Sequence, residues 1–200
     1  MSFSLSPYLV DLRKARGAIG SEDEKLRRMI GGKFKAAMAH ADDWFADQIA
    51  GGAPTRYDAL RAVVDGGPFD DAYGFQYGYA FEMICGFFGR SLNNNAFSPF
   101  RSGWLARVDE GLAALGVTAV EVSEFSYGSP PAPLPRPAEF VPAYGEWSPK
   151  QCRTALAQWN AATAEAREAL DPEVLEAVES CVAWMRESVA NGRHVVAFHF

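Results

Sequence analysis

One segment of the chain combines an isolated carboxylate with a regular series of glycines. Between Ala72 and Gly89 the only acidic side chain is Glu82, and there is no lysine or arginine; aromatic and aliphatic residues surround it. The glycines stand four residues apart, and Glu82 fills the one gap in their series: Gly74, Gly78, Gly86. On a helix with about 3.6 residues per turn, these four positions form one narrow stripe. Tyr73–Arg90 is therefore predicted to be a buried helix with a single carboxylate on its glycine face.

Two interpretations of this stripe remain open. Each glycine costs a helix about 1 kcal/mol relative to alanine, and close approach of another backbone or of a ligand usually offsets that cost. In the first interpretation the stripe packs against a neighbouring element, and Glu82 is held by an arginine or by backbone donors. In the second it lines a pocket in which Glu82 is the polar anchor or a general acid–base, with its pKa raised by burial. Tyr73 and Tyr77 then join Glu82 as candidate binding residues.

The loop that follows this helix is a candidate binding edge. It carries Asn94, Arg101 and Trp104, a mixture of polar and aromatic side chains typical of contact surfaces. The alternative is an ordinary connection with Trp104 tucked into the core.

Patterns for metal, nucleophilic or phosphate chemistry are missing. His194 and His199 are five residues apart in a predicted strand, so their side chains point to opposite faces. No Gly-x-Ser-x-Gly, Walker or dinucleotide-binding motif occurs. The sequence predicts no metal site, no cofactor and no catalytic residue.

Composition narrows the class of protein. The net charge is −6 and no basic stripe occurs, which argues against nucleic acid as a partner. No apolar run reaches the roughly 18 residues of a membrane helix, and the first residues do not resemble a signal peptide. Cys85, Cys152 and Cys181 are far apart and are expected to be buried, reduced residues. These features predict a cytoplasmic protein without membrane contact.

The predicted fold is α+β, with a small sheet of about three strands covered by about six to seven helices. Residues 2–10 and 194–200 read as strands that pair the two termini, and the β-branched run Thr118–Phe125 reads as the third. Pro7 places the first strand at an edge or at a bulge. Helices are expected to begin after Thr55, Ser148 and Asp171, residues that favour N-caps.

A proline-rich stretch follows the predicted middle strand. Six of the twelve prolines fall between Pro130 and Pro142, too many for a helix or a central strand. The 55 or so residues after it are near the lower limit for an independent core. Residues 128–147 are therefore predicted to be a loop wrapped over a single domain, 1–200.

Three stretches together carry a family resemblance: Tyr8–Arg13, Tyr77–Cys85 and Trp104–Asp109. With the proline stretch and the terminal strand, they resemble a bacterial family, common in actinobacteria, that is defined as a domain of unknown function. This resemblance spans nearly the whole chain and implies a single bacterial cytoplasmic domain, without any activity to transfer. The chain is also similar, more distantly, to small α/β proteins encoded near toxin or contact-dependent systems.

Two function classes are expected. The first is a non-catalytic binding or interaction protein, of the immunity or antitoxin kind, whose partner is another protein. The alternative is a small-molecule enzyme or ligand-binding protein with its pocket at the Gly74/Gly78/Glu82/Gly86 helix face.

Overall fold

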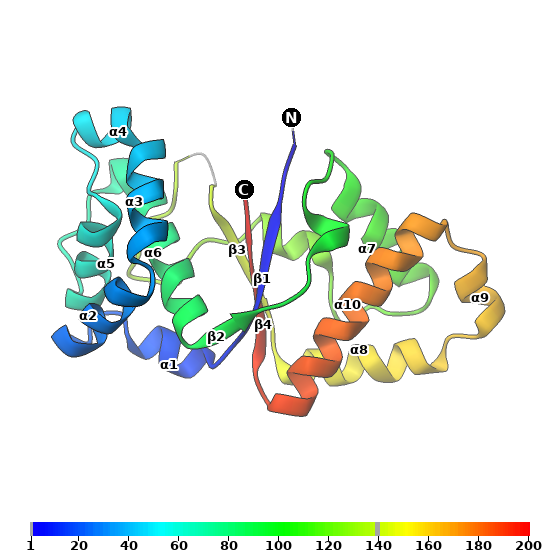
Figure 1. Cartoon of the computed structure of the whole chain (residues 1–200). Helices are drawn as coiled ribbons and strands as arrows, with labels where there is room; N and C mark the ends of the chain where they lie inside the picture. Colours follow the sequence, from blue (N-terminus) through cyan, green and yellow to red (C-terminus); the bar gives the residue numbers. More distant parts are fainter. Residues whose placement is uncertain (1, 139–140) are drawn as a thin grey trace. The chain divides into compact units, whose positions relative to one another are not determined.

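The computed structural model describes residues 2–138 and 141–200, and they fall into two compact units (Figure 1). Unit 1 is formed from the segments 1–10, 91–128 and 144–200. Unit 2 is formed from 11–90 and 129–143. The chain therefore crosses between the units several times, and the prolines between Pro130 and Pro142 all belong to unit 2.

The sheet has the strand order β2-β1-β4-β3, and its two inner strands come from the two ends of the chain. Its strands are β1 (Leu5–Val10), β2 (Gly89–Ser91), β3 (Ala143–Trp147) and β4 (His194–His199). β1 and β4 are antiparallel and lie side by side in Figure 1, with Leu5 opposite His199 and Leu9 opposite Val195. The predicted α+β class and the pairing of the terminal strands are confirmed.

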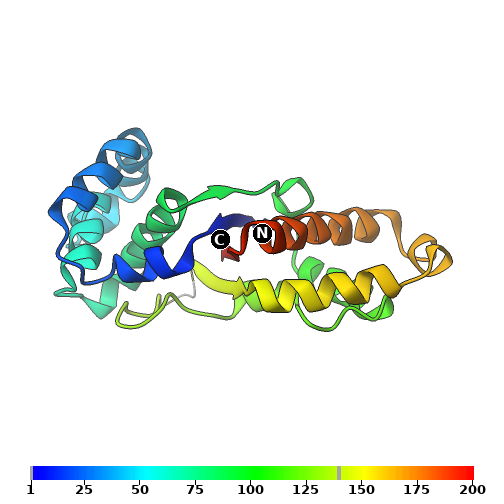
Figure 2. The same cartoon turned by 90° about the horizontal axis from the view of Figure 1, so that it is seen from below.

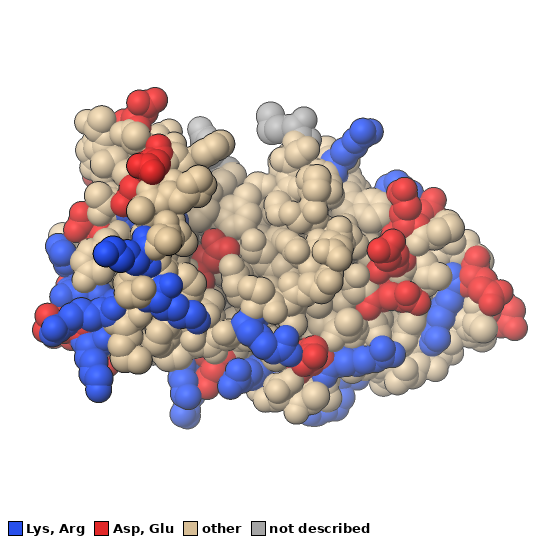
Figure 3. All heavy atoms as spheres, viewed as in Figure 1, with Lys and Arg blue, Asp and Glu red and all other residues tan. Residues whose placement is uncertain are grey.

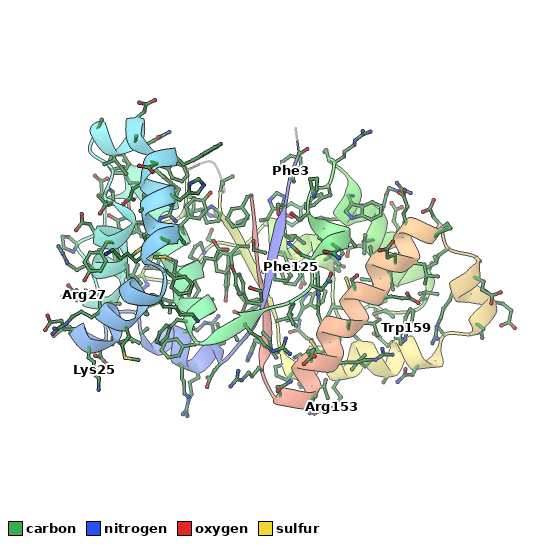
Figure 4. All side chains as sticks on the ribbon, in the orientation of Figure 1. Phe3, Lys25, Arg27, Phe125, Arg153 and Trp159 are labelled. Carbon is green, nitrogen blue, oxygen red and sulfur yellow. The ribbon has the colours of Figure 1, made fainter. Side chains whose placement is uncertain are left out.

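Unit 1 also contains most of the helices from the second half of the chain. They are α7 (Trp104–Ala114), α8 (Pro149–Ala161), α9 (Ala164–Glu168) and α10 (Pro172–Asn191), with the short 3-10 helices η2 (Asn95–Phe97) and η3 (Val122–Ser126). Among them α10 and η3 contact the inner strands, and α7 and α8 pack on α10. Figure 2 shows α8 and α10 running side by side. The core that they share with β1 and β4 contains Trp147 and Trp184, both essentially unexposed. Phe125, labelled in Figure 4, packs on Trp147 with 4.6 Å between ring centroids.

Local sequence signals explain where the long helices begin. Ser148 and Gln151 form a reciprocal capping box at the start of α8, followed by Pro149. Asp171 accepts hydrogen bonds from two backbone N–H groups at the start of α10, before Pro172. α10 ends at Gly192, which adopts the left-handed conformation that glycine tolerates best.

Unit 2 is helical and is built around α6 (Gly74–Phe87). The other helices are α1 (Leu12–Gly17), α2 (Glu24–Lys33), α3 (Lys35–Trp44), α4 (Ala46–Ala50), α5 (Arg56–Asp65) and the 3-10 helix η1 (Asp71–Tyr73). α6 confirms the predicted helix: Tyr77, Phe81 and Ile84 are buried, and the Thr55 side chain caps α5 as expected. Because α6 is apolar on most of its surface, it is the natural centre of this unit.

The predicted strand Thr118–Phe125 is wrong, because side chains take up its backbone donors. The Asp109 carboxylate accepts hydrogen bonds from the backbone N–H groups of Val122 and Ser123. The Gln158 side chain accepts from the N–H groups of Thr118 and Ala119 in the same way. With these donors engaged the segment forms η3 instead of a ladder, and its apolar side chains still enter the core.

Three further expectations need correction. The sheet has four strands, because the short β2 and β3 were not foreseen, and β3 lies within the predicted loop 128–147. β1 is not an edge strand: Pro7 lacks an N–H but accepts a hydrogen bond from Leu92 through its carbonyl. The described residues form ten α-helices instead of six or seven, since helices as short as α4 and α9 leave little periodicity to detect.

An aromatic cluster near the ends of the chain contains a histidine. The His199 ring stacks on Phe3, with 5.3 Å between centroids, and lies 5.7 Å from the ring of Phe100 (Phe3 is labelled in Figure 4). Burial lowers the pKa of His199 below its ordinary value. The folded protein therefore resists protonation of this imidazole more than the unfolded chain does.

We expect this histidine to make stability depend on pH below neutrality. A histidine whose pKa is lower in the folded than in the unfolded state loses stability as pH falls through the unfolded value, about 6.5, towards the folded value. Above that window it contributes no pH dependence. Urea unfolding should show that, between pH 7.5 and 5, the free energy of unfolding falls less for His199→Gln than for the wild type. The control is His40→Gln, at an exposed position on α3, which should behave as the wild type does. Equal slopes for all three proteins would show that His199 does not titrate in this way.

Candidate functional site

A groove of about 690 Å³ lies on unit 1, between the loop that follows β2, the start of α7 and the start of α10. Ala96, Phe100 and Trp104 supply its less exposed, mostly apolar part. Its exposed charged residues are Arg101, Arg107, Glu173 and Glu176. The groove thus combines an apolar floor with a charged rim, the usual arrangement of a contact surface.

Hydrogen bonds from side chains fix the loop that forms the floor. The Asn94 side chain donates to the carbonyl of Leu5 at 2.8 Å, and the Trp184 indole donates to the carbonyl of Asn93 at 2.7 Å. The Trp104 indole donates to the carbonyl of Ala96 at 2.9 Å, which fixes the ring itself. The groove is therefore shaped before anything binds, which reduces the entropy lost on binding.

The rim carries charges of both signs, most of them without a partner. Arg107 lies 5.4 Å from the ring centroid of Trp104 and 3.6 Å from a carboxylate oxygen of Asp171. Within the described residues, the side chains of Arg101, Glu173 and Glu176 take part in no ion pair or hydrogen bond. Figure 3 shows acidic and basic side chains close together over α7 and α10. Such a rim can pair with charges on a binding partner.

Glu82 lies in the field of a buried arginine of unit 2. Arg56 at the start of α5 is only 4% exposed, and its guanidinium carbon lies 4.2 Å from the ring centroid of Tyr79. Burial lowers the pKa of Arg56 to about 10, while the charges of Tyr79, Glu82 and Asp42 act to raise it. Burial also raises the pKa of Tyr79, and the negative charge of Glu82 adds to that effect. The half-buried Glu82 thus offsets part of the cost of burying Arg56.

The glycine stripe does not line a pocket at Gly74 and Gly78, contrary to the second interpretation. A Cβ added at Gly74 would stand 2.7 Å from the backbone oxygen of Arg136, and one at Gly78 would stand 2.9 Å from the ring of Pro142. The proline-rich part of unit 2 therefore occupies the space above these glycines. Close approach of another backbone is what compensates for glycine here.

The predicted binding residues have different surroundings. Arg101 and Trp104 both line the groove of unit 1, and Asn94 braces the loop behind it. In unit 2, the Tyr73 hydroxyl donates to the carbonyl of Gly51, and the buried Tyr77 hydroxyl accepts from the N–H of Asp70. Of the predicted binding residues, Arg101 and Trp104 therefore lie in one groove, whereas Tyr73, Tyr77 and Glu82 belong to unit 2.

Sequence reasoning missed part of the groove. Phe100 and Arg107 flank predicted residues, and Arg107 lies three positions after Trp104 on the same helix face, a spacing that could have suggested it. Glu173 and Glu176 lie some 70 positions further along, and no local pattern places α10 beside the loop.

The described part of the chain offers little support for metal binding or for a cysteine nucleophile. No group of three or more His, Cys, Asp or Glu side chains there is arranged to hold a metal ion. Cys85, Cys152 and Cys181 are buried and form no disulfide, and burial raises the pKa of Cys152 and of Cys181. A raised pKa keeps these two residues in the thiol form, which is a poor nucleophile.

The comparisons with known proteins place the α+β chain in a family. The model of a domain of unknown function (DUF7691) matches residues 1–200, so the chain belongs to that family. No curated protein and no solved structure matches it significantly. Among the described residues, no helix has the length and apolar character needed to cross a membrane.

We predict that Glu82→Gln destabilises the protein. The substitution removes a charge that compensates the buried Arg56 guanidinium, and we expect a loss of about 1–2 kcal/mol, or several degrees in Tm. The control is Glu24→Gln, since Glu24 pairs with Arg28 at an exposed site where a salt bridge contributes little. Thermal unfolding followed by circular dichroism measures both. A Tm of Glu82→Gln equal to that of the wild type would show that the carboxylate is not needed for stability, and would favour a direct functional role.

Proposed function

We propose that the protein binds another protein, in a stoichiometric complex, through the groove of unit 1. The observation that carries this proposal is the combination of a fixed tryptophan with unpaired charges of both signs. Tryptophan and arginine are the residue types most enriched among the few side chains that dominate binding energies. Trp104 is anchored through its indole N–H, and Arg101 stands exposed beside it.

The charges indicate what kind of segment fits. A partner segment would place an apolar side chain on Phe100 and Trp104, and a carboxylate against Arg101. A lysine or arginine of the same segment would meet Glu173 and Glu176. Paired charges of this sort mainly set specificity and the association rate, and salt screens them. An immunity or antitoxin role is one form that such stoichiometric binding takes.

The experiment compares two variants in co-purification. We expect the tagged wild type to recover a partner in stoichiometric amount from native lysate at low salt, and the complex to elute as one peak in size-exclusion chromatography. Arg101→Ala with Glu173→Ala should weaken that complex by roughly 30-fold, equivalent to about 2 kcal/mol.

The control is Arg153→Ala, an exposed arginine on α8 that does not line the groove (labelled in Figure 4). It removes the same type of side chain and should bind the partner as the wild type does. A wild type that stays alone and monomeric, or a groove variant that recovers the same partner equally well, would contradict the proposal.

A further inference from the structure

Unit 2 contains a second hollow, a cavity of about 280 Å³ beside α6. Three aromatic side chains line it: Phe45, Phe75 and Tyr79. Ala72, Ala138 and Val141 add apolar lining, and Gln48 is the only amide among the described residues that line the cavity. Among the residues that the structure describes, 2–138 and 141–200, the lining therefore offers ring faces and one neutral hydrogen-bonding group, and it includes no carboxylate, ammonium or guanidinium.

The aromatic wall is held by contacts within the unit. The ring of Phe45 lies 5.1 Å from that of Phe75 and 5.6 Å from that of Tyr79, measured between centroids. All three rings remain partly exposed. Ring faces left uncovered at a concave site are the surface that a planar apolar ligand covers best.

The opposite wall comes from the proline-rich segment, and the glycines of α6 position it. Ala138 and Val141 lie between Arg136 and Pro142, the residues that approach Gly74 and Gly78. Phe75 and Tyr79 each follow one of these glycines directly in the sequence. Phe75 and Tyr79, which line the cavity, therefore lie on α6 next to the glycines that the proline-rich segment covers.

Electrostatics decide the charge of a fitting ligand. Aromatic cages often bind cations, but here the guanidinium of Arg56 already lies 4.2 Å from the ring centroid of Tyr79 and 5.7 Å from that of Phe45. A second cation on these rings would be repelled. An anion would be repelled by Asp42 and Glu82, which do not line the cavity but whose charges act on Arg56 beside it. A neutral ligand avoids both penalties.

The side-chain amide of Gln48 supplies the polar recognition. Gln48 is exposed, and within the described residues its side chain makes no hydrogen bond. A carboxamide can both accept from a ring N–H and donate to a ring nitrogen or carbonyl. We propose that this cavity binds a small, neutral, planar heteroaromatic molecule of one or two rings, stacked among Phe45, Phe75 and Tyr79 and hydrogen-bonded to Gln48.

Indole is a suitable first probe, with indene as the isostere that lacks the N–H group. Titration of the full chain, followed by ¹H–¹⁵N chemical shifts, should show saturable binding of indole in the micromolar to millimolar range expected for so small a ligand. The shifts should centre on the residues around Phe45, Phe75 and Tyr79. Indene should bind more weakly, and Gln48→Ala should reduce the affinity for indole to that for indene.

Two variants fill the cavity without removing a core side chain, since Ala72 and Ala138 are both exposed and line it. Ala72→Leu and Ala138→Leu should each weaken indole binding at least tenfold. Ala37→Leu, the same change at an exposed position of α3 outside the cavity lining, should leave it unchanged. Unchanged amide spectra away from the cavity establish that the variants are folded.

Three outcomes would overturn the proposal. The first is no binding of indole up to its solubility limit, and the second is binding to both filled variants as tight as to the wild type, which places indole elsewhere. Tighter binding of tetramethylammonium or of benzoate than of indole would contradict the neutral class of ligand. These results are independent of the groove of unit 1, because none of the variants touches it.

Discussion

The close packing of the proline-rich segment on α6 determines the surroundings of the α6 glycines and the position of the cavity in unit 2. Gly74 and Gly78 leave room for the backbone of Arg136 and for the ring of Pro142, at distances that no Cβ would allow. Proline suits the other side of this contact, because its fixed backbone loses little entropy when it is ordered without helix or sheet bonds. The contact between the helix and the stiff proline segment thus compensates for the helix stability that the two glycines cost. The cavity exists because that contact holds Ala138 and Val141 opposite the aromatic face of the helix.

The two units illustrate different ways of preparing a surface for binding. In unit 1, side chains such as those of Asn94 and Trp184 fix a loop by hydrogen bonds, and most charged side chains of the rim form no ion pair. In unit 2, packing of rings leaves an apolar hollow, while the charges beneath it are compensated among Arg56, Asp42 and Glu82. An open charged groove suits a protein segment, and a smaller neutral hollow suits a small molecule. The two proposals therefore assign different partners to different features.

Much of the fold was predictable where local interactions decide it. The nearly charge-free pattern of α6, the caps of α8 and α10 and the terminal strands each have a local physical cause. The middle strand was mispredicted because β-branched residues indicate burial, whereas the backbone donors of Val122 and Ser123 bond to the distant Asp109 carboxylate. Of the residues that line the groove, Arg101 and Trp104 could be named from one loop, whereas Glu173, like Arg56 in unit 2, required knowledge of which helices meet. An arginine or backbone donors near Glu82 are what the first interpretation expects, and the sequence does not indicate that Arg56 is the arginine whose charge acts with it.

The most direct test of the packing between α6 and the proline-rich segment is the stability of glycine-to-alanine variants. At Gly74 and Gly78 alanine would press on neighbouring backbone and ring atoms, and we predict a loss of about 1–3 kcal/mol in the free energy of unfolding. Gly32 lies in α2 with nothing within 4 Å of an added Cβ, so alanine there should stabilise the protein by up to about 1 kcal/mol. Urea unfolding followed by circular dichroism compares the three variants. Gly74→Ala and Gly78→Ala proteins as stable as Gly32→Ala would contradict the account.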